Sequence, residues 1–211
     1  MLKTLGLTIA LLVTGVNAQQ IGDGTVDVYF QQLSRNGVRY GCSLVFTSLV
    51  SDTAYSNGNQ IIMNGNIAVQ TFRDGQLSFT GKLGTKPLAD LDKTNTWTTP
   101  AHFYFSSQSG TTAKAAKMLG AESNGYKLLL ADAFDKRVLA LIMDIIKTEE
   151  FTVGFNRKHG GLDVYTVVKI NTSLQRNPDG TSQWVQSTAT PLAFISCMTR
   201  LFEDIEQQLS K

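Results

Sequence analysis

The chain contains two histidines, and one of them has an acidic residue nearby in the sequence. His159 precedes Asp163 in a glycine-rich stretch, whereas His102 lies in an aromatic segment. An acidic group can orient an imidazole for general-base catalysis, but hydrolysis also needs a nucleophile beside the ring. The chain has no G-x-S-x-G sequence, and spacing alone places no serine near His159. A secreted hydrolase that uses His159 and Asp163 is therefore an alternative, and we assign no catalytic residue.

Scattered acidic residues belong to the same alternative. Glycoside hydrolysis needs two carboxyl groups that face each other across a cleft, and spacing does not show such a pair. On a helix, an aspartate near the first turn simply complements the helix dipole. The candidate carboxylates are Asp132, Asp135, Asp144, Glu149 and Glu150.

Sequence motifs for a metal or a nucleotide are absent. There is no H-E-x-x-H, no paired set of cysteines, no Walker loop and no G-x-G-x-x-G after a predicted strand. Asp90 and Asp92, with Asn95, offer oxygen atoms of the kind that calcium binds, but the rest of a calcium-binding pattern is missing. We therefore expect no cofactor and no metal.

The first residues are typical of a secretory signal peptide. Lys3 provides a positive start, residues 5–16 are apolar but too short to span a bilayer, and small residues precede Gln19. We predict cleavage after Ala18, so that residues 1–18 are a signal peptide and residues 19–211 form a single β-rich domain. Export to the periplasm or the extracellular space, without a transmembrane anchor, is the expected localisation.

Export places the two cysteines in an oxidising compartment. Cys42 lies near the start of the chain and Cys197 near its end. Pairing is the default under oxidising conditions, so we predict a Cys42–Cys197 disulfide, with two separate buried thiols as the alternative. No C-x-x-C sequence points to redox catalysis.

The charge balance bears on the class of partner. The formal net charge is +2, and it becomes +1 when Lys3 is removed with the signal peptide. A nearly neutral chain without a basic run argues against nucleic acid or an anionic membrane as the main partner.

Alternating apolar and polar residues predict many short strands. Segments 25–32 and 43–50 come first, and two short strands, 61–63 and 67–72, flank Asn64-Gly65-Asn66. Asn36-Gly37 and Arg73-Asp74-Gly75 predict hairpin turns, and Asn177-Pro178-Asp179-Gly180 predicts a turn or loop. Further strands are predicted at 77–83, 101–106, 126–131, 151–155 and 162–170.

Helices are expected in three places. Thr111 to Leu119 is alanine-rich and ends before Gly120, which predicts a short helix. Asp135 to Lys147 fits a helix face, although its β-branched residues leave a strand possible. Pro191 to Leu209 carries an apolar stripe that includes Cys197, with Thr190 as the expected cap. We predict a mainly β fold, an antiparallel β-sandwich or barrel, with the C-terminal amphipathic helix packed on it and one or two further helices.

Two tryptophans lie in polar, loop-like segments. Trp97 is flanked by threonines, and Trp184 follows Thr181. An exposed aromatic residue in a loop can anchor a partner, although such a residue more often covers the edge of a core. Trp97 and Trp184 are the candidate partner-binding residues.

The layout of the C-terminal part resembles that of small exported bacterial proteins. A strand over Leu162 to Ile170 is followed by a loop and by Phe194-x-x-Cys197-x-x-x-Leu201, and Gly41-Cys42-Ser43 lies early in the chain. This outline is similar to the invasion-associated locus B family and to the accessory envelope proteins of type VI secretion. The resemblance implies a β-sandwich with one disulfide and an interaction role without enzymatic activity. The chain departs from those proteins between Thr111 and Lys147.

These observations favour an exported, non-enzymatic binding or interaction protein with a protein partner. The alternatives are the secreted hydrolase described above and a carrier of a small apolar ligand held inside the sandwich or barrel.

Overall fold

The computed structural model describes residues 22–71, 76–90, 97–112, 116–121, 125–131 and 134–209. The signal peptide predicted at residues 1–18 lies outside these ranges, and so do residues 73–75, where a hairpin turn was predicted.

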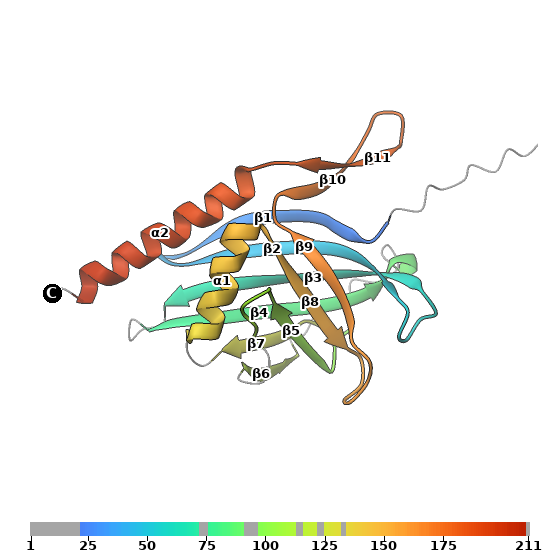
Figure 1. Ribbon diagram of the computed structural model, residues 1–211, viewed down its shortest axis with the longest axis horizontal. Coiled ribbons are helices and arrows are strands. Elements are labelled where there is room, and N and C mark those ends of the chain that lie inside the picture. The colour runs from blue at the N-terminus through green and yellow to red at the C-terminus, as the bar shows by residue number, and fades with distance from the viewer. Residues whose placement is uncertain are drawn as a thin grey trace, which may run out of the picture.

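A six-stranded antiparallel sheet forms the larger part of the fold (Figure 1), with the strand order β1-β2-β3-β4-β7-β6. Consecutive hairpins connect β1 to β4, and the first turns at Asn36-Gly37, where both residues have the positive φ that a tight hairpin turn requires. The strands are β1 (Gly24–Arg35), β2 (Val38–Asp52), β3 (Asn59–Thr71), β4 (Leu77–Pro87), β6 (Ala116–Ala121) and β7 (Lys127–Ala131).

A three-stranded antiparallel sheet, with the order β5-β8-β9, packs on one face of the larger sheet. A two-stranded hairpin follows it and projects from the body in Figure 1. The strands are β5 (His102–Ser106), β8 (Glu150–Asn156), β9 (Val164–Lys169), β10 (Thr172–Arg176) and β11 (Ser182–Gln186). The helices are the 3-10 turn η1 (Leu88–Asp90), α1 (Lys136–Thr148) and α2 (Ala189–Leu209).

Phenylalanine rings from both sheets form the core between them. Phe46 of β2 meets Phe151 of β8 edge-on at 5.6 Å between ring centroids, and Phe79 of β4 meets Phe105 of β5 at 6.0 Å. The predicted fold class is therefore confirmed as mainly β, antiparallel, with a C-terminal helix. Of the two predicted arrangements, the described strands form no closed barrel, because the larger sheet ends at β1 and β6.

Strand β3 is one continuous strand where two short ones were predicted. It runs unbroken from Asn59 to Thr71, so Asn64-Gly65-Asn66 lies inside a strand and does not separate two short ones. Hydrogen bonding to β2 on one side and to β4 on the other outweighs the low strand preference of asparagine and glycine.

The helix predicted for Thr111 to Leu119 is wrong. Ala116–Ala121 forms strand β6, and Thr111 makes an isolated bridge to Ser106. Pairing of β6 with β7 outweighs the helix preference of alanine, and Gly120, expected to end a helix, lies at an irregularity in that pairing. The ambiguous segment that begins at Asp135 is helical and forms α1.

Helix α2 begins two residues earlier than predicted. The Thr190 hydroxyl does not cap the helix but donates to the Val28 carbonyl oxygen of β1 at 3.2 Å. The apolar stripe is as expected, because Phe194, Met198 and Leu201 are all buried. No helix among the described residues is long and apolar enough to cross a membrane.

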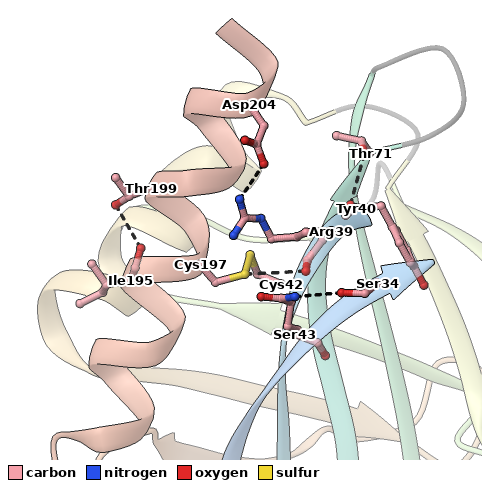
Figure 2. Close-up of a disulfide and its surroundings, with 12 residues drawn as sticks. Ser34, Arg39, Tyr40, Cys42, Ser43, Thr71, Ile195, Cys197, Thr199 and Asp204 are labelled. Carbon is pink, nitrogen blue, oxygen red and sulfur yellow. Dashed lines mark hydrogen bonds and ion pairs between the residues drawn. A yellow bond between two sulfur atoms is a disulfide. The ribbon is translucent and has the colours of Figure 1, made fainter. Parts of the chain in front are cut away.

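The predicted disulfide joins α2 to β2 (Figure 2). Cys42 and Cys197 are bonded, with their Cα atoms 6.0 Å apart, and both are buried. Farther along the helix, Asp204 accepts from Arg39 Nη2 at 2.7 Å, so a second contact holds α2 against the start of β2.

Replacing Cys197 by serine is expected to lower the free energy of unfolding by about 4–5 kcal/mol, because the bond closes a very long loop in the unfolded chain. Denaturant unfolding under oxidising conditions measures this difference. Cys42→Ser and the double variant should lose the same amount, since each removes the same bond. Equal unfolding midpoints for wild type and Cys197→Ser would contradict the prediction.

Candidate functional site

The structure does not pair His159 with Asp163. His159 lies exposed in the turn between β8 and β9. Asp163 Oδ1 instead accepts from Asn156 Nδ2 at 3.2 Å. No hydrogen bond from His159 is found among the described residues. The other histidine, His102, is exposed at the start of β5, opposite Asn156.

Asp163 interacts electrostatically with Tyr104 rather than with a histidine. Burial raises the pKa of Tyr104, and the charge and hydrogen bond of Asp163 raise it further. Tyr104 lies across Gly154, where an added Cβ would sit 2.2 Å from the tyrosine ring. Burial and the neighbouring carboxylate therefore both disfavour ionisation of the Tyr104 hydroxyl.

The candidate carboxylates on α1 accept hydrogen bonds from nearby residues. Asp135 is the N-cap of α1 and accepts from the backbone N–H groups of Arg137 and Val138, each at 3.0 Å. Asp144, on the same helix, accepts from the Ser109 hydroxyl at 2.5 Å, and hydrogen bonds from Ser109 and Ser107 lower its pKa.

Two further acidic candidates lie beyond the end of α1. Glu149 Oε2 accepts from Asn171 Nδ2 at 2.6 Å, and Glu150 is exposed at the first position of β8. Asp132 lies outside the described residues, and so does Asp92 of the acidic loop. In the part of the chain that the structure describes, no three His, Cys, Asp or Glu side chains gather as a metal site would require.

The two candidate tryptophans pack on different strands. Trp97 lies over Gly84 of β4 and beside Tyr126, with the ring centroids 5.5 Å apart. Trp184 was expected in a loop, but it lies in β11, is 41% exposed and packs against Gly24 at the start of β1. Each tryptophan therefore packs over a glycine of the larger sheet.

A polar depression lies on the outer face of the larger sheet, the face turned away from the smaller sheet. Its volume is about 260 Å³ and it is open to solvent. In Figure 1, α1 and β8 cross in front of the larger sheet, so this outer face points away from the viewer. The lining residues are Tyr29, Gln31, Val45, Asn64, Gly65, Asn66, Lys82 and Tyr126.

Pairing of the strands brings these side chains together. Tyr29 is opposite Val45, Val45 is opposite Asn66, and Asn66 is opposite Lys82, so one row crosses β1 to β4. Asn64 is opposite Thr47 in a neighbouring row. Directly opposed side chains on one face have Cβ atoms about 4.5–5.5 Å apart, which makes the row continuous.

Hydrogen bonds orient the two asparagines of the depression. Asn64 Nδ2 donates to Thr47 Oγ1 at 2.8 Å and to the Phe46 carbonyl oxygen at 3.2 Å, while its Oδ1 accepts from the Tyr126 hydroxyl. Asn66 Nδ2 donates to Ser43 Oγ at 3.2 Å. Asn66 Oδ1 is buried and has no hydrogen-bond partner.

Sequence reasoning missed this site. Its residues come from β1, β2, β3, β4 and the segment before β7, so only the register of the sheet brings them together. The available signal was two asparagines where a central strand prefers β-branched or aromatic residues.

Comparisons of the chain with protein-family models, with curated proteins and with solved structures find no match. The resemblance to the invasion-associated locus B family and to the type VI secretion accessory proteins therefore stays a prediction from layout.

Asp135→Ala is expected to lower the free energy of unfolding by about 1 kcal/mol, the usual cost of losing an N-cap. The hydrogen bond from the Val138 N–H, followed by that from the Arg137 side chain, lowers the pKa of Asp135 in the folded protein. Its stabilising effect is thus present above the unfolded pKa, about 3.9, and is lost as pH falls through the folded value. Denaturant unfolding at neutral and at acidic pH measures both effects.

Asp135→Asn is the matched control, because asparagine caps a helix about as well as aspartate but does not titrate. It should retain most of the stability at neutral pH and show no acid-dependent loss from this position. An Asp135→Ala variant as stable as wild type at neutral pH would contradict the capping role.

Proposed function

We propose that this chain is an exported, non-enzymatic binding protein and that it holds its ligand in the depression on the outer face of β1 to β4. The disulfide supports an oxidising location such as the periplasm or the extracellular space, because such bonds persist there.

The observation that carries this proposal is the pair of asparagines inside the central strand β3. Asn64 and Asn66 lie between two hydrogen-bonded neighbouring strands, where they pack less well than β-branched residues. Residues whose local structural preference opposes the fold tend to occur at functional sites. The side chains of Asn64 and Asn66 lie in a depression beside two tyrosines. A binding site needs a few polar groups in fixed positions, and these amides are such groups.

The described residues give the alternatives less support. A hydrolase needs a base and a nucleophile, or two carboxyl groups, that face a common cleft, whereas Asp163, Asp135 and Asp144 make the local hydrogen bonds described above. A carrier needs an enclosed apolar cavity, whereas interlocking phenylalanine rings occupy the space between the sheets.

Tyr29→Ala is the variant that tests the proposal. Tyr29 is 51% exposed in the depression, so its truncation removes contact area with a ligand and little of the core. Immobilised protein should retain a component from the envelope or the culture medium of its source, and Tyr29→Ala should retain about tenfold less, the effect expected of an aromatic anchor.

Tyr165→Ala is the matched control. Tyr165 is 66% exposed on the outer face of the smaller sheet, so the same truncation is made on a strand outside the depression. Equal retention by wild type and Tyr29→Ala would contradict the proposed site. Turnover of a substrate that a single Asp, Glu or His substitution abolishes would contradict the non-enzymatic function.

A further inference from the structure

Several asparagines of this chain are followed directly by glycine. Asparagine is a thermolabile residue, and it loses its side-chain amide most readily before glycine, which has no Cβ to hinder the approach of its own backbone nitrogen. The Asn-Gly dipeptides are Asn36-Gly37, Asn57-Gly58, Asn64-Gly65 and Asn124-Gly125. The structure describes the first three completely, whereas Asn124 lies outside the described residues. Because these dipeptides share the same local chemistry, the fold around each one decides its reactivity.

Deamidation before a glycine is a ring closure followed by hydrolysis. The glycine backbone nitrogen bonds to the side-chain carbonyl carbon of the asparagine, and the side-chain NH2 leaves as ammonia with the proton that the backbone nitrogen gives up. Water then opens the resulting succinimide ring at one of its carbonyl groups, which yields aspartate or isoaspartate. The reaction consumes water and releases ammonia, and no oxidant or cofactor takes part.

A folded chain can prevent this ring closure in two ways. A hydrogen bond from the glycine N–H to an acceptor holds the nitrogen away from the side chain and has to be broken first. Tight packing around the peptide stops the rotation that brings the nitrogen and the carbonyl carbon together. A reactive Asn-Gly dipeptide therefore has an unengaged glycine N–H and open space around the glycine.

The Asn64-Gly65 dipeptide meets neither condition. Gly65 is buried in β3, which is hydrogen-bonded to β2 on one side and to β4 on the other. An added Cβ at Gly65 would lie 2.3 Å from the Lys82 carbonyl oxygen, so the peptide has no room to rotate. Asn64 Nδ2 also donates to Thr47 Oγ1 at 2.8 Å, which fixes the amide group in place. Asn64 should therefore keep its amide in the folded protein.

The Asn57-Gly58 dipeptide fails on the hydrogen bond. Asn57 is exposed in the loop between β2 and β3, but the Gly58 N–H donates to the Asp52 carbonyl oxygen at 2.9 Å. The Asp52 carboxylate strengthens this loop, because it accepts from the Tyr55 N–H at 2.8 Å and from the Ser56 hydroxyl at 3.0 Å. The fold therefore slows the reaction at this exposed asparagine.

The Asn36-Gly37 dipeptide meets both conditions. Both residues are exposed at the tip of the β1–β2 hairpin, and an added Cβ at Gly37 would meet no atom within 4 Å. The strand pairing ends at Arg35 and Val38, so the hydrogen bond that closes this two-residue turn uses the Val38 N–H. Within the described part of the chain, no hydrogen bond from the Gly37 N–H is found.

We propose that Asn36 is a site of spontaneous deamidation and that the fold directs the reaction to Asn36 rather than to Asn57 or Asn64. The product places a carboxylate next to Arg35, whose guanidinium lies 5.7 Å from the centroid of the Tyr40 ring. Isoaspartate also lengthens the backbone of a turn whose geometry requires two residues. Asn36 lies outside the residues that line the depression, so the reaction does not depend on the proposed binding function.

Peptide mass spectrometry of the folded, disulfide-bonded protein after incubation at mildly alkaline pH tests this assignment. Chymotryptic peptides are suitable, because trypsin would cleave at Arg35, and a sample taken at the start corrects for deamidation during digestion. Deamidation at Asn36 should be at least about tenfold faster than at Asn57 and at Asn64. Equal rates at Asn36 and Asn57, or a faster reaction at Asn57 or Asn64, would overturn the proposal.

The reduced and denatured chain is the control for the effect of the fold. In that state the same three asparagines should react at rates within about threefold of one another. A preference for Asn36 that is as large in the denatured chain as in the folded protein would overturn the claim that the fold directs the reaction.

A pair of variants tests the same site by ion-exchange chromatography of aged protein. Asn36→Gly removes the reactive amide and still suits the positive φ of the turn, so it should accumulate less of the acidic form than wild type does. Asn57→Gly is the matched control, since it makes the same change at another position of positive φ, and it should accumulate as much as wild type. Equal accumulation by wild type and Asn36→Gly would overturn the proposal.

Discussion

Phe105 is the side chain on which the packing of the two sheets depends. Its ring makes edge-on contacts with four other phenylalanine rings, at centroid distances of 5.6–6.3 Å, and these rings come from both sheets. Gly81 makes this possible, because a Cβ there would lie 2.3 Å from the Phe105 ring. Such ring pairs add to the burial of apolar area and lock one face of β1 to β4 inward. The partner rings are Phe46, Phe79, Phe103 and Phe151.

That inward face determines what the outer face can be. Side chains alternate along a strand, so with Phe46 inside, Val45 and Thr47 must point outward. Cys42 shares the inward face with Phe46, and its disulfide to Cys197 therefore draws α2 to the side that the smaller sheet already covers. The helix and the smaller sheet stabilise one face together, which leaves the depression on the other face open to solvent.

Local pattern was enough to predict the fold class and the disulfide, because alternation and compartment chemistry are properties of short segments or of residue type. It favoured a helix at α1 but left a strand possible, and it did not identify Asp135 as the N-cap. Prediction from local pattern failed where pairing between strands distant in the sequence determines the structure. Alanine-rich Thr111 to Leu119 contributes to β6, since pairing with β7 provides more than helix preference does. The polar hairpin of β10 and β11, with Trp184 opposite Leu174, was missed for the same reason, and only its turn at Asn177 to Gly180 was recognised.

The candidate site also shows where prediction from local sequence pattern fails. Asn64-Gly65-Asn66 was predicted to interrupt a strand, because asparagine and glycine disfavour strands. In the structure the strand continues through these unfavourable residues, because β2 and β4 are hydrogen-bonded to it on either side. The side chains of Asn64 and Asn66 then make hydrogen bonds on the outer face, to Thr47 and to Ser43 of β2. Asn66 lies beside the exposed ring of Tyr29 in the depression, so the proposed site lies on β1 to β4 rather than at the tryptophans that the sequence first indicated.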